Sequence, residues 1–395
     1  MKIRTECRHF PGDRPCVYHK QGLASCGDCA AYEPRGTSIL IVKLDALGDV
    51  LRTTSVLPSL KRAYGTCHVT WVTADGARDL LVGNPLVDEV LLFPSTCLPA
   101  LLTRRFDVVI NPDASPRSCE LAAIARAGAR HGFVIGEGGE VIPLGPAARE
   151  WLVAGGSDPA KRSNEKTYQQ VLHEMCGVSA EGQHIVLCLS REETESRDRL
   201  AGMVGIDLGR PVVGINTGAG KRWKLKQWRM EGFIEVIGSL LDTTDADIVL
   251  LGGEAERERN CLIRSHFSQR VTNPEVTSLR GFIQLVDLCD VILTGDTLAL
   301  HVATGLGKRV VAIFGPTSSK EIDLYGRGTK IVPGMDCTCC YKAECSRHPN
   351  CMDRVLSEAV FQAVVRELAS LAGRRSGERG EVSRETYSMV GEPGR

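Results

Sequence analysis

Three junctions between an expected strand and an expected helix hold most of the polar residues that could do chemistry. The first is Lys43–Leu51 (KLDALGDVL), where Gly48 permits close backbone approach and Asp49 stands at the start of a helix. Asp49 is either an N-cap or a general base that takes a proton from a substrate hydroxyl, and spacing alone favours the cap. Asp45 is a rival carboxylate in the same loop.

The second junction is Asn216–Trp228 (NTGAGKRWKLKQW), in which small and basic residues directly follow an expected strand. Backbone N–H groups and ammonium groups of this kind can bind a diphosphate. The loop is not a Walker A motif, because Ile215 stands where that pattern needs glycine and Arg222 follows Lys221 where it needs serine or threonine. An exposed basic loop explains the same residues equally well.

The third junction is Thr294–Ala303 (TGDTLALHVA), again a strand, a glycine and a helix. We expect Asp296 or Thr297 to cap this helix, and its free N–H groups to stabilise a leaving phosphate. His301 lies in the first turns of the helix, where a packed polar residue is a more common role than a catalyst.

A further segment, Gly252–Glu256 (GGEAE), ends another expected strand. Glu254 or Glu256 could accept hydrogen bonds from a ribose diol. The alternative is that both are helix-start carboxylates that interact with the helix dipole.

These junctions need a scaffold of strands that alternate with helices, which predicts α/β architecture with parallel sheets. Pro58 is expected to kink the helix over residues 50–64. Residues 118–127 are expected to be helical, and the connection between the two α/β series is placed near residues 190–209. The expected layout is a cysteine-rich module (1–36), two doubly wound α/β domains (37–190 and 210–354), a C-terminal helix (355–372) and a disordered tail (373–395). Ligands are expected at the carboxyl ends of the strands.

Composition restricts the function classes. The 395 residues include 48 Lys+Arg and 48 Asp+Glu, so the net charge is zero. A neutral chain gives no reason to expect a nucleic-acid partner. The sequence has no run approaching the about 18 apolar residues of a membrane span. Its first residues, MKIRTECRHFPGDRPC, have no apolar signal region, so we expect a cytoplasmic protein.

The order of the motifs resembles the ADP-heptose:lipopolysaccharide heptosyltransferase family, glycosyltransferase family 9. The resemblance runs from about Ile39 to Val360 and rests on LDALGDVLRTT, GAG-x-x-W-x-x-K-x-W, GG-x-x-E, TGDTLALHVA and FGPT. The cysteine-rich segment CTCCYKAECSRHPNCMDRV is also similar to the C-terminal segment of many members.

The resemblance implies a GT-B fold, in which two Rossmann-like domains, one for the acceptor and one for the donor nucleotide, flank the active site. Family members transfer a heptose with inversion from ADP-L-glycero-β-D-manno-heptose to an inner-core sugar, without a required metal or other cofactor. Asp49 matches the general base, and domain closure must bring it to the donor. A lipid-linked glycan acceptor implies a position at the inner membrane face, with no nucleic-acid partner.

The same resemblance implies a set of donor-binding residues. Lys226 matches the lysine that holds the donor diphosphate, and Glu256 matches the glutamate that contacts the adenosine ribose. The third junction matches the loop that binds the donor. The full implied set is Thr217, Gly218, Lys226, Glu256, Asp296, Thr297, Leu298 and His301. The second junction departs from many relatives, which have a proline before the Gly-Ala pair, so the donor sugar and base stay open. Alternatives are another nucleotide-sugar donor, a nucleotide-sugar epimerase of GT-B fold, or a non-catalytic, metal-binding regulatory relative.

Sixteen cysteines are unevenly placed, and a reducing cytosol disfavours structural disulfides. Four fall in the first 29 residues: Cys7, Cys16, Cys26 and Cys29. They fit a structural zinc site or, less well, an iron–sulfur cluster, with His9 and His19 as reserve ligands; the alternative is four reduced thiols in a loop. A second and weaker set is Cys337, Cys340, Cys345 and Cys351.

Overall fold

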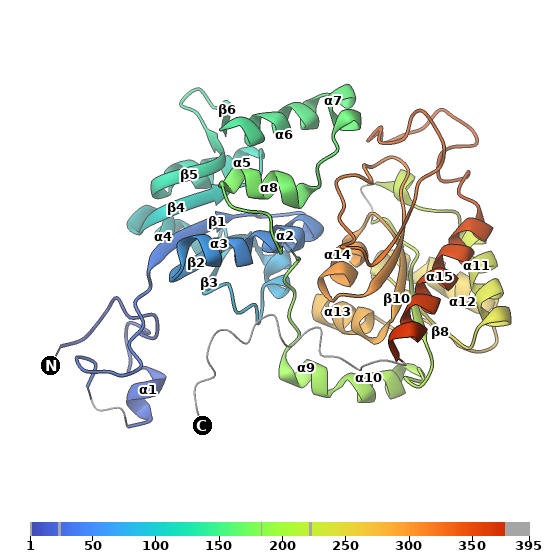
Figure 1. Cartoon of the computed structure of the whole chain (residues 1–395), viewed down its shortest axis with the longest axis horizontal. Coiled ribbons are helices and arrows are strands. Elements are labelled where there is room, and N and C mark those ends of the chain that lie inside the picture. The colour runs from blue at the N-terminus through green and yellow to red at the C-terminus, as the bar shows by residue number, and fades with distance from the viewer. Residues whose placement is uncertain (1, 23–24, 183, 221–222, 376–395) are drawn as a thin grey trace. The chain divides into compact units, whose positions relative to one another are not determined.

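The structure is a computed structural model that describes residues 2–22, 25–182, 184–220 and 223–375. The chain divides into two compact units, Met1–Ser157 with Tyr168–Val186, and Asp158–Thr167 with Leu187–Arg395 (Figure 1). Lys221, Arg222 and residues 376–395 of the predicted tail lie outside the described residues. The tail was predicted to begin at residue 373, but the last helix runs to Arg375.

The first unit is built on a six-stranded sheet of order β3-β2-β1-β4-β5-β6, parallel except for β6, which runs antiparallel to β5. Its inner strands are continuous apolar runs because helices cover both faces of such sheets. The strands are β1 (Thr37–Val42), β2 (Cys67–Ala74), β3 (Glu89–Phe93), β4 (Arg105–Asn111), β5 (Arg126–Ile135) and β6 (Val141–Leu144). The main helices of this unit are α2 (Leu47–Thr53), α3 (Leu57–Tyr64), α4 (Cys97–Thr103), α5 (Pro116–Ile124), α6 (Pro146–Gly156) and α8 (Tyr168–Cys176).

Two local predictions for this unit need correction. The helix expected over residues 50–64 is interrupted by a 3₁₀ turn at Thr54–Val56, and Pro58 lies in the first turn of α3, where a missing N–H leaves no hydrogen bond unmade. The helix expected to reach residue 127 ends at Ile124, and Arg126 already begins β5. Strand β5 (RAGARHGFVI) was missed because its first half carries two arginines, has no large apolar side chain and is largely exposed.

The second unit holds a fully parallel sheet of order β12-β11-β10-β7-β8-β9. Its strands are β7 (Val212–Asn216), β8 (Asp247–Leu251), β9 (Val271–Thr272), β10 (Val291–Gly295), β11 (Arg309–Ile313) and β12 (Gly328–Ile331). Its helices are α7 (Asp158–Ser163), α9 (Arg191–Glu195), α10 (Arg197–Val204), α11 (Met230–Thr243), α12 (Arg257–Ser265), α13 (Leu279–Leu288), α14 (Leu298–Gly305) and α15 (Ser357–Arg375). Helix α15 packs on α11 and supplies Val360, Ala363 and Val364 to the core.

Both sheets have the same topology. Numbered within each sheet in chain order, the strands run 3-2-1-4-5-6, the doubly wound arrangement that confirms the predicted α/β class. The order reverses between β1 and β4 in the first sheet and between β7 and β10 in the second, so the loops that leave those strands diverge and leave room for ligands. Among the described helices, none is both long and apolar enough to cross a membrane.

Candidate functional site

Asp49 lies in the first turn of α2, directly after β1, but it is not the helix cap that spacing favoured. The N-cap residue is Ala46, with extended φ and ψ, and Asp49 is the third residue of the helix. Its carboxylate pairs with Arg52 at 2.8 Å, and its side chain is 37% exposed. The partly exposed carboxylate is therefore held in one direction while it stays accessible.

A buried ion pair joins the two strands at the reversal of the first sheet. Lys43, one residue past β1, places its Nζ 2.8 Å from Oδ2 of Asp113, which follows β4, and only 4% of the lysine side chain is exposed. Burial alone would lower the pKa of Lys43, but Tyr168, Asp49 and Asp113 together raise it above its ordinary value. Lys43 thus stays charged beside Asp49.

Arg52 is fixed from its other side by an aromatic ring. Its guanidinium lies 3.8 Å from the centroid of Tyr168, whose hydroxyl is 2.7 Å from Oγ1 of Thr53. The rival carboxylate, Asp45, is 60% exposed and meets Arg117 only at 3.9 Å. The structure therefore surrounds Asp49, and not Asp45, with ordered charged and aromatic groups.

The second unit contains a cavity of about 480 Å³ at the carboxyl ends of β7, β8 and β10. It is lined by the segments 216–220, 252–256, 276–282 and 297–299. Four residues of the predicted donor set lie on its wall: Gly218, Glu256, Thr297 and Leu298. Three loops that are distant in sequence thus meet at one site.

The side chain of Glu256 reaches the cavity because Gly218, which lies against it, has no side chain. Its Oε2 accepts a hydrogen bond from the backbone N–H of Gly253 at 2.9 Å, so the helix-start role that we considered is real. A Cβ at Gly218 would stand 2.2 Å from Oε1 of Glu256. Only glycine at position 218 leaves the carboxylate in this place.

Asn216 connects the loops around the cavity and was not among the predicted site residues. Its Nδ2 donates toward the backbone oxygen of Gly218 at 3.2 Å, Oγ1 of Thr297 at 3.2 Å and Oγ1 of Thr294 at 3.3 Å. The one available signal was its position as the last residue of β7. Asn216 therefore sets the spacing between the second and third junctions.

Lys226 and Asp296 form an ion pair beside this cavity. Nζ of Lys226 lies 2.9 Å from Oδ2 and 3.1 Å from the backbone oxygen of Asp296. Burial would raise the pKa of Asp296, but Lys226 and His301 outweigh it and lower that pKa. Neither Lys226 nor Asp296 lines the cavity wall. The ion pair holds both side chains in a defined geometry.

The remaining predicted donor residues are buried. His301 is 7% exposed, which fits the packed role, and it is one of the groups that lower the pKa of Asp296. Thr217 is 1% exposed and its hydroxyl donates to Oδ1 of Asn260, so its side chain supports the loop and does not line the cavity. Thr297 is the N-cap residue of α14, which decides between the two expected caps, Asp296 and Thr297.

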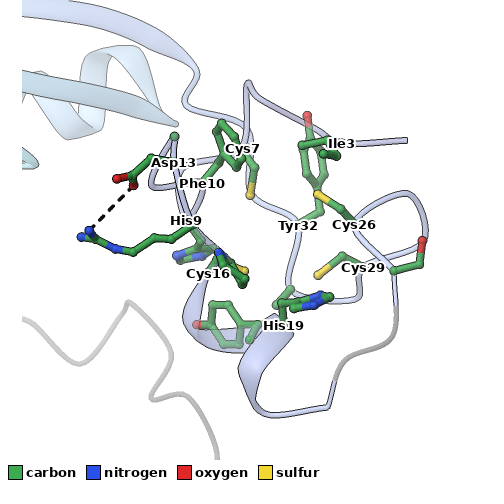
Figure 2. Close-up of a pocket in the computed structure, with 16 residues that line it drawn as sticks. Ile3, Cys7, His9, Phe10, Asp13, Cys16, His19, Cys26, Cys29 and Tyr32 are labelled. Carbon is green, nitrogen blue, oxygen red and sulfur yellow. Dashed lines mark ion pairs between the residues drawn. The ribbon is translucent and has the colours of Figure 1, made fainter. Parts of the chain in front are cut away.

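All sixteen cysteines lie among the described residues and have free thiols. The four N-terminal ones line a common cavity of about 330 Å³ (Figure 2). Within the C-terminal set, burial raises the pKa of Cys351, and the nearby thiols of Cys340, Cys337 and Cys345 raise it further. Among the described residues, no three His, Cys, Asp or Glu side chains are placed closely enough to hold a metal ion.

Comparison with known proteins connects this geometry to one family. Residues 98–350 match the family model described as glycosyltransferase family 9 (heptosyltransferase). The chain is 22% identical over 293 residues to the lipopolysaccharide core heptosyltransferase OpsX of Haemophilus influenzae, covering 70% of this chain and 78% of that protein.

Two solved structures share the fold. The family 9 glycosyltransferase of Veillonella parvula matches with a TM-score of 0.68 at 19% identity and covers 85% of this chain and 97% of its own. The ADP-heptose lipopolysaccharide heptosyltransferase II of Escherichia coli matches with a TM-score of 0.62 at 19% identity, over 86% and 100%. These matches confirm the GT-B fold, and the family model shows that the chain is a glycosyltransferase that belongs to family 9, the heptosyltransferase family.

Proposed function

We propose that this enzyme is an inverting transferase that moves a heptose from an ADP-activated donor to a hydroxyl of a lipopolysaccharide core or related glycan. One observation carries the proposal: the cavity at the carboxyl ends of β7, β8 and β10 has a carboxylate, glycine backbone and a helix N-terminus on its wall. The choice of donor and acceptor is supported by the relatives described above, a lipopolysaccharide core heptosyltransferase and an ADP-heptose lipopolysaccharide heptosyltransferase.

The donor cavity suits a nucleoside diphosphate. The Thr297 hydroxyl contacts Asn216 and Thr294 and does not cap α14, so the first N–H groups of that helix remain available to an anion. We assign the diphosphate to this helix start and the ribose diol to Glu256. As the bond to the sugar breaks, negative charge grows on the leaving ADP, and the helix start stabilises it.

Lys226 is assigned to the same diphosphate. Because Lys226 is paired with Asp296, a donor phosphate must compete with that carboxylate for the ammonium group or share the ammonium group with it. The pair holds the ammonium group in place before the donor arrives, which lowers the entropic cost of binding.

Asp49 is assigned as the general base. It removes the proton from the acceptor hydroxyl while that oxygen attacks the anomeric carbon, and the bond from this carbon to the ADP oxygen breaks with inversion. Arg52 orients the carboxylate through the 2.8 Å pair, and Lys43 adds a second positive charge nearby. A lipid-linked acceptor would place the enzyme at the inner face of the membrane.

The test is transfer of heptose from ADP-heptose to deep-rough lipopolysaccharide by Asp49→Asn and, as its matched control, Asp45→Asn. Loss of a positioned general base costs about 10²- to 10⁴-fold in rate, so we expect that loss in the first variant and near wild-type transfer in the second. Full activity of Asp49→Asn would refute the assignment. Turnover of the donor without acceptor would instead favour an epimerase, and no turnover by the wild type with any nucleotide-sugar would favour a non-catalytic relative.

A further inference from the structure

The N-terminal module, residues 2–36, has almost no core of its own. Among its described residues Cys7 alone is buried, while Ile3 and Val17 are 52% and 57% exposed. Its one helix, α1 (Val17–Lys20), has four residues. A segment this small buries too little apolar surface to hold one conformation, and such segments are usually stabilised by disulfides or a metal.

The four thiols of the module are arranged around one cavity. Cys7, Cys16, Cys26 and Cys29 line it together with the reserve ligands His9 and His19 (Figure 2). They come from three separate parts of the module: the bridge between Cys7 and Pro34, the N-cap of α1 at Cys16, and the turn Cys26–Cys29. One bound group at this cavity would therefore cross-link the whole module.

The turn Cys26–Cys29 is already supported in the way that metal-binding turns are. The backbone N–H of Arg4 donates to Sγ of Cys26 at 3.2 Å, and its guanidinium donates to the backbone oxygen of Gly27 at 3.0 Å. The same guanidinium stacks 4.2 Å from the ring centroid of Tyr32. Hydrogen bonds of this kind orient the ligands of metal sites and are a recurring part of the shell around them.

We propose that Cys7, Cys16, Cys26 and Cys29 bind one zinc ion that fixes this module. Four thiols lose four protons and a Zn²⁺ ion gains four sulfur ligands, the tetrahedral set of structural zinc sites. In the described residues the thiols line the cavity without being at ligating distances, so binding must draw them inward. Zinc is favoured over an iron–sulfur cluster because it needs only the four thiolates and no inorganic sulfide.

The module contacts the first α/β sheet. A module with one conformation would therefore also have one position on that sheet. Arg8 forms a 2.8 Å ion pair with Asp88 and donates to the backbone oxygen of Cys67 at 2.9 Å. These contacts are made by the residue next to Cys7. The proposed role of zinc is structural, and it does not depend on the proposed heptose transfer.

The test is metal analysis of the full-length protein purified without oxygen. We expect the double variant Cys26→Ser/Cys29→Ser to lose about one zinc per chain relative to the wild type, and the control Cys261→Ser, at an exposed cysteine of the second unit, to lose none. A Cys337→Ser/Cys340→Ser variant separates any metal at the C-terminal set from this site.

A second readout is Co²⁺ substitution. Wild-type protein loaded with Co²⁺ should show thiolate-to-cobalt charge-transfer absorption that the Cys26→Ser/Cys29→Ser variant lacks, and circular dichroism checks that the variant's α/β units remain folded. An unchanged metal content in the N-terminal variant would overturn the proposal. Loss of iron with acid-labile sulfide in place of zinc would also overturn it.

Discussion

The strand order reverses in the same way in the two α/β units, but different groups occupy the place where it reverses. Between β1 and β4, charged side chains meet one another, and Lys43 is buried against Asp113. Between β7 and β10, glycines and a helix start leave a cavity of about 480 Å³. Side chains at the first reversal fix the direction of one carboxylate, while backbone at the second makes room for a ligand. The same topology thus orients a carboxylate in one unit and forms a ligand cavity in the other, and the loop residues make the difference.

The largest effect that tests this comparison is expected at the buried pair. Lys43→Met leaves the Asp113 carboxylate without its partner in a mostly buried site, which should lower the free energy of unfolding by about 3 kcal/mol. Chemical denaturation measures this value. The control is Lys61→Met, which removes a more exposed lysine and leaves Asp88 paired with Arg8 at 2.8 Å, so it should cost less than about 1 kcal/mol.

The double variant Lys43→Met/Asp113→Leu sharpens the result. If the cost comes from an unpaired carboxylate, the double variant should recover much of the lost stability, because no buried charge remains. Equal losses in Lys43→Met and Lys61→Met would mean that the ion pair at the first reversal contributes no more to stability than another ion pair of the same unit.

An intermediate effect is expected at the cavity. Gly218→Ala pushes the carboxylate of Glu256 away from its hydrogen bond with Gly253, so the KM for the donor should rise about tenfold, or about 1.4 kcal/mol. Steady-state kinetics with varied donor measures this change. Gly238→Ala in α11, where an added Cβ meets open space, is the control and should leave KM unchanged. If Glu256 binds the ribose, adding Glu256→Ala to Gly218→Ala should cause little further loss.

The smallest effect concerns the ion pair between Glu193 of α9 and Arg280 of α13. Hydrogen bonds from Arg280 lower the pKa of Glu193 to about 2, and its Oε1 lies 2.7 Å from the Arg280 Nε. A carboxylate with a lowered pKa contributes stability above its unfolded pKa of about 4.3 and loses it as the pH falls toward 2.

Glu193→Gln should therefore unfold about 1 kcal/mol more easily at pH 7 and no more easily than the wild type near pH 2. Urea unfolding at the two pH values gives the comparison. A difference that persists at the lower pH would mean that the lost interaction does not depend on ionised Glu193.

Much of the fold could be predicted from local pattern. The apolar runs EVLLF and DIVLL coincide with strands β3 and β8, and the helical pattern LRGFIQLVDL coincides with α13, because apolar runs and helical periodicity are local properties. Strand β5 was missed because its first half carries two arginines and is largely exposed, and its pairing with β4 is what makes it a strand. Asp49 was misplaced as a cap because the cap depends on the backbone angles of Ala46, which spacing does not report.

The sequence named residues of the candidate site one by one, but only the fold shows which of them line one cavity. The motifs identified Asp49, Lys226 and Glu256, and the fold places Glu256 on the cavity wall. Asn216 was overlooked because its role lies in contacts with Thr294 and Thr297, 78 and 81 residues away.

The sequence by itself determined the alternation of strands and helices and the chemical types at each junction, since both depend on neighbouring residues. Only the tertiary structure decided which junctions meet. Lys43 contacts Asp113, 70 residues later in the chain, because the strand order places β1 beside β4. Asn216 contacts Thr297 because β7 lies beside β10. Strand neighbours are set by the packing of the whole sheet, and no local pattern encodes that choice.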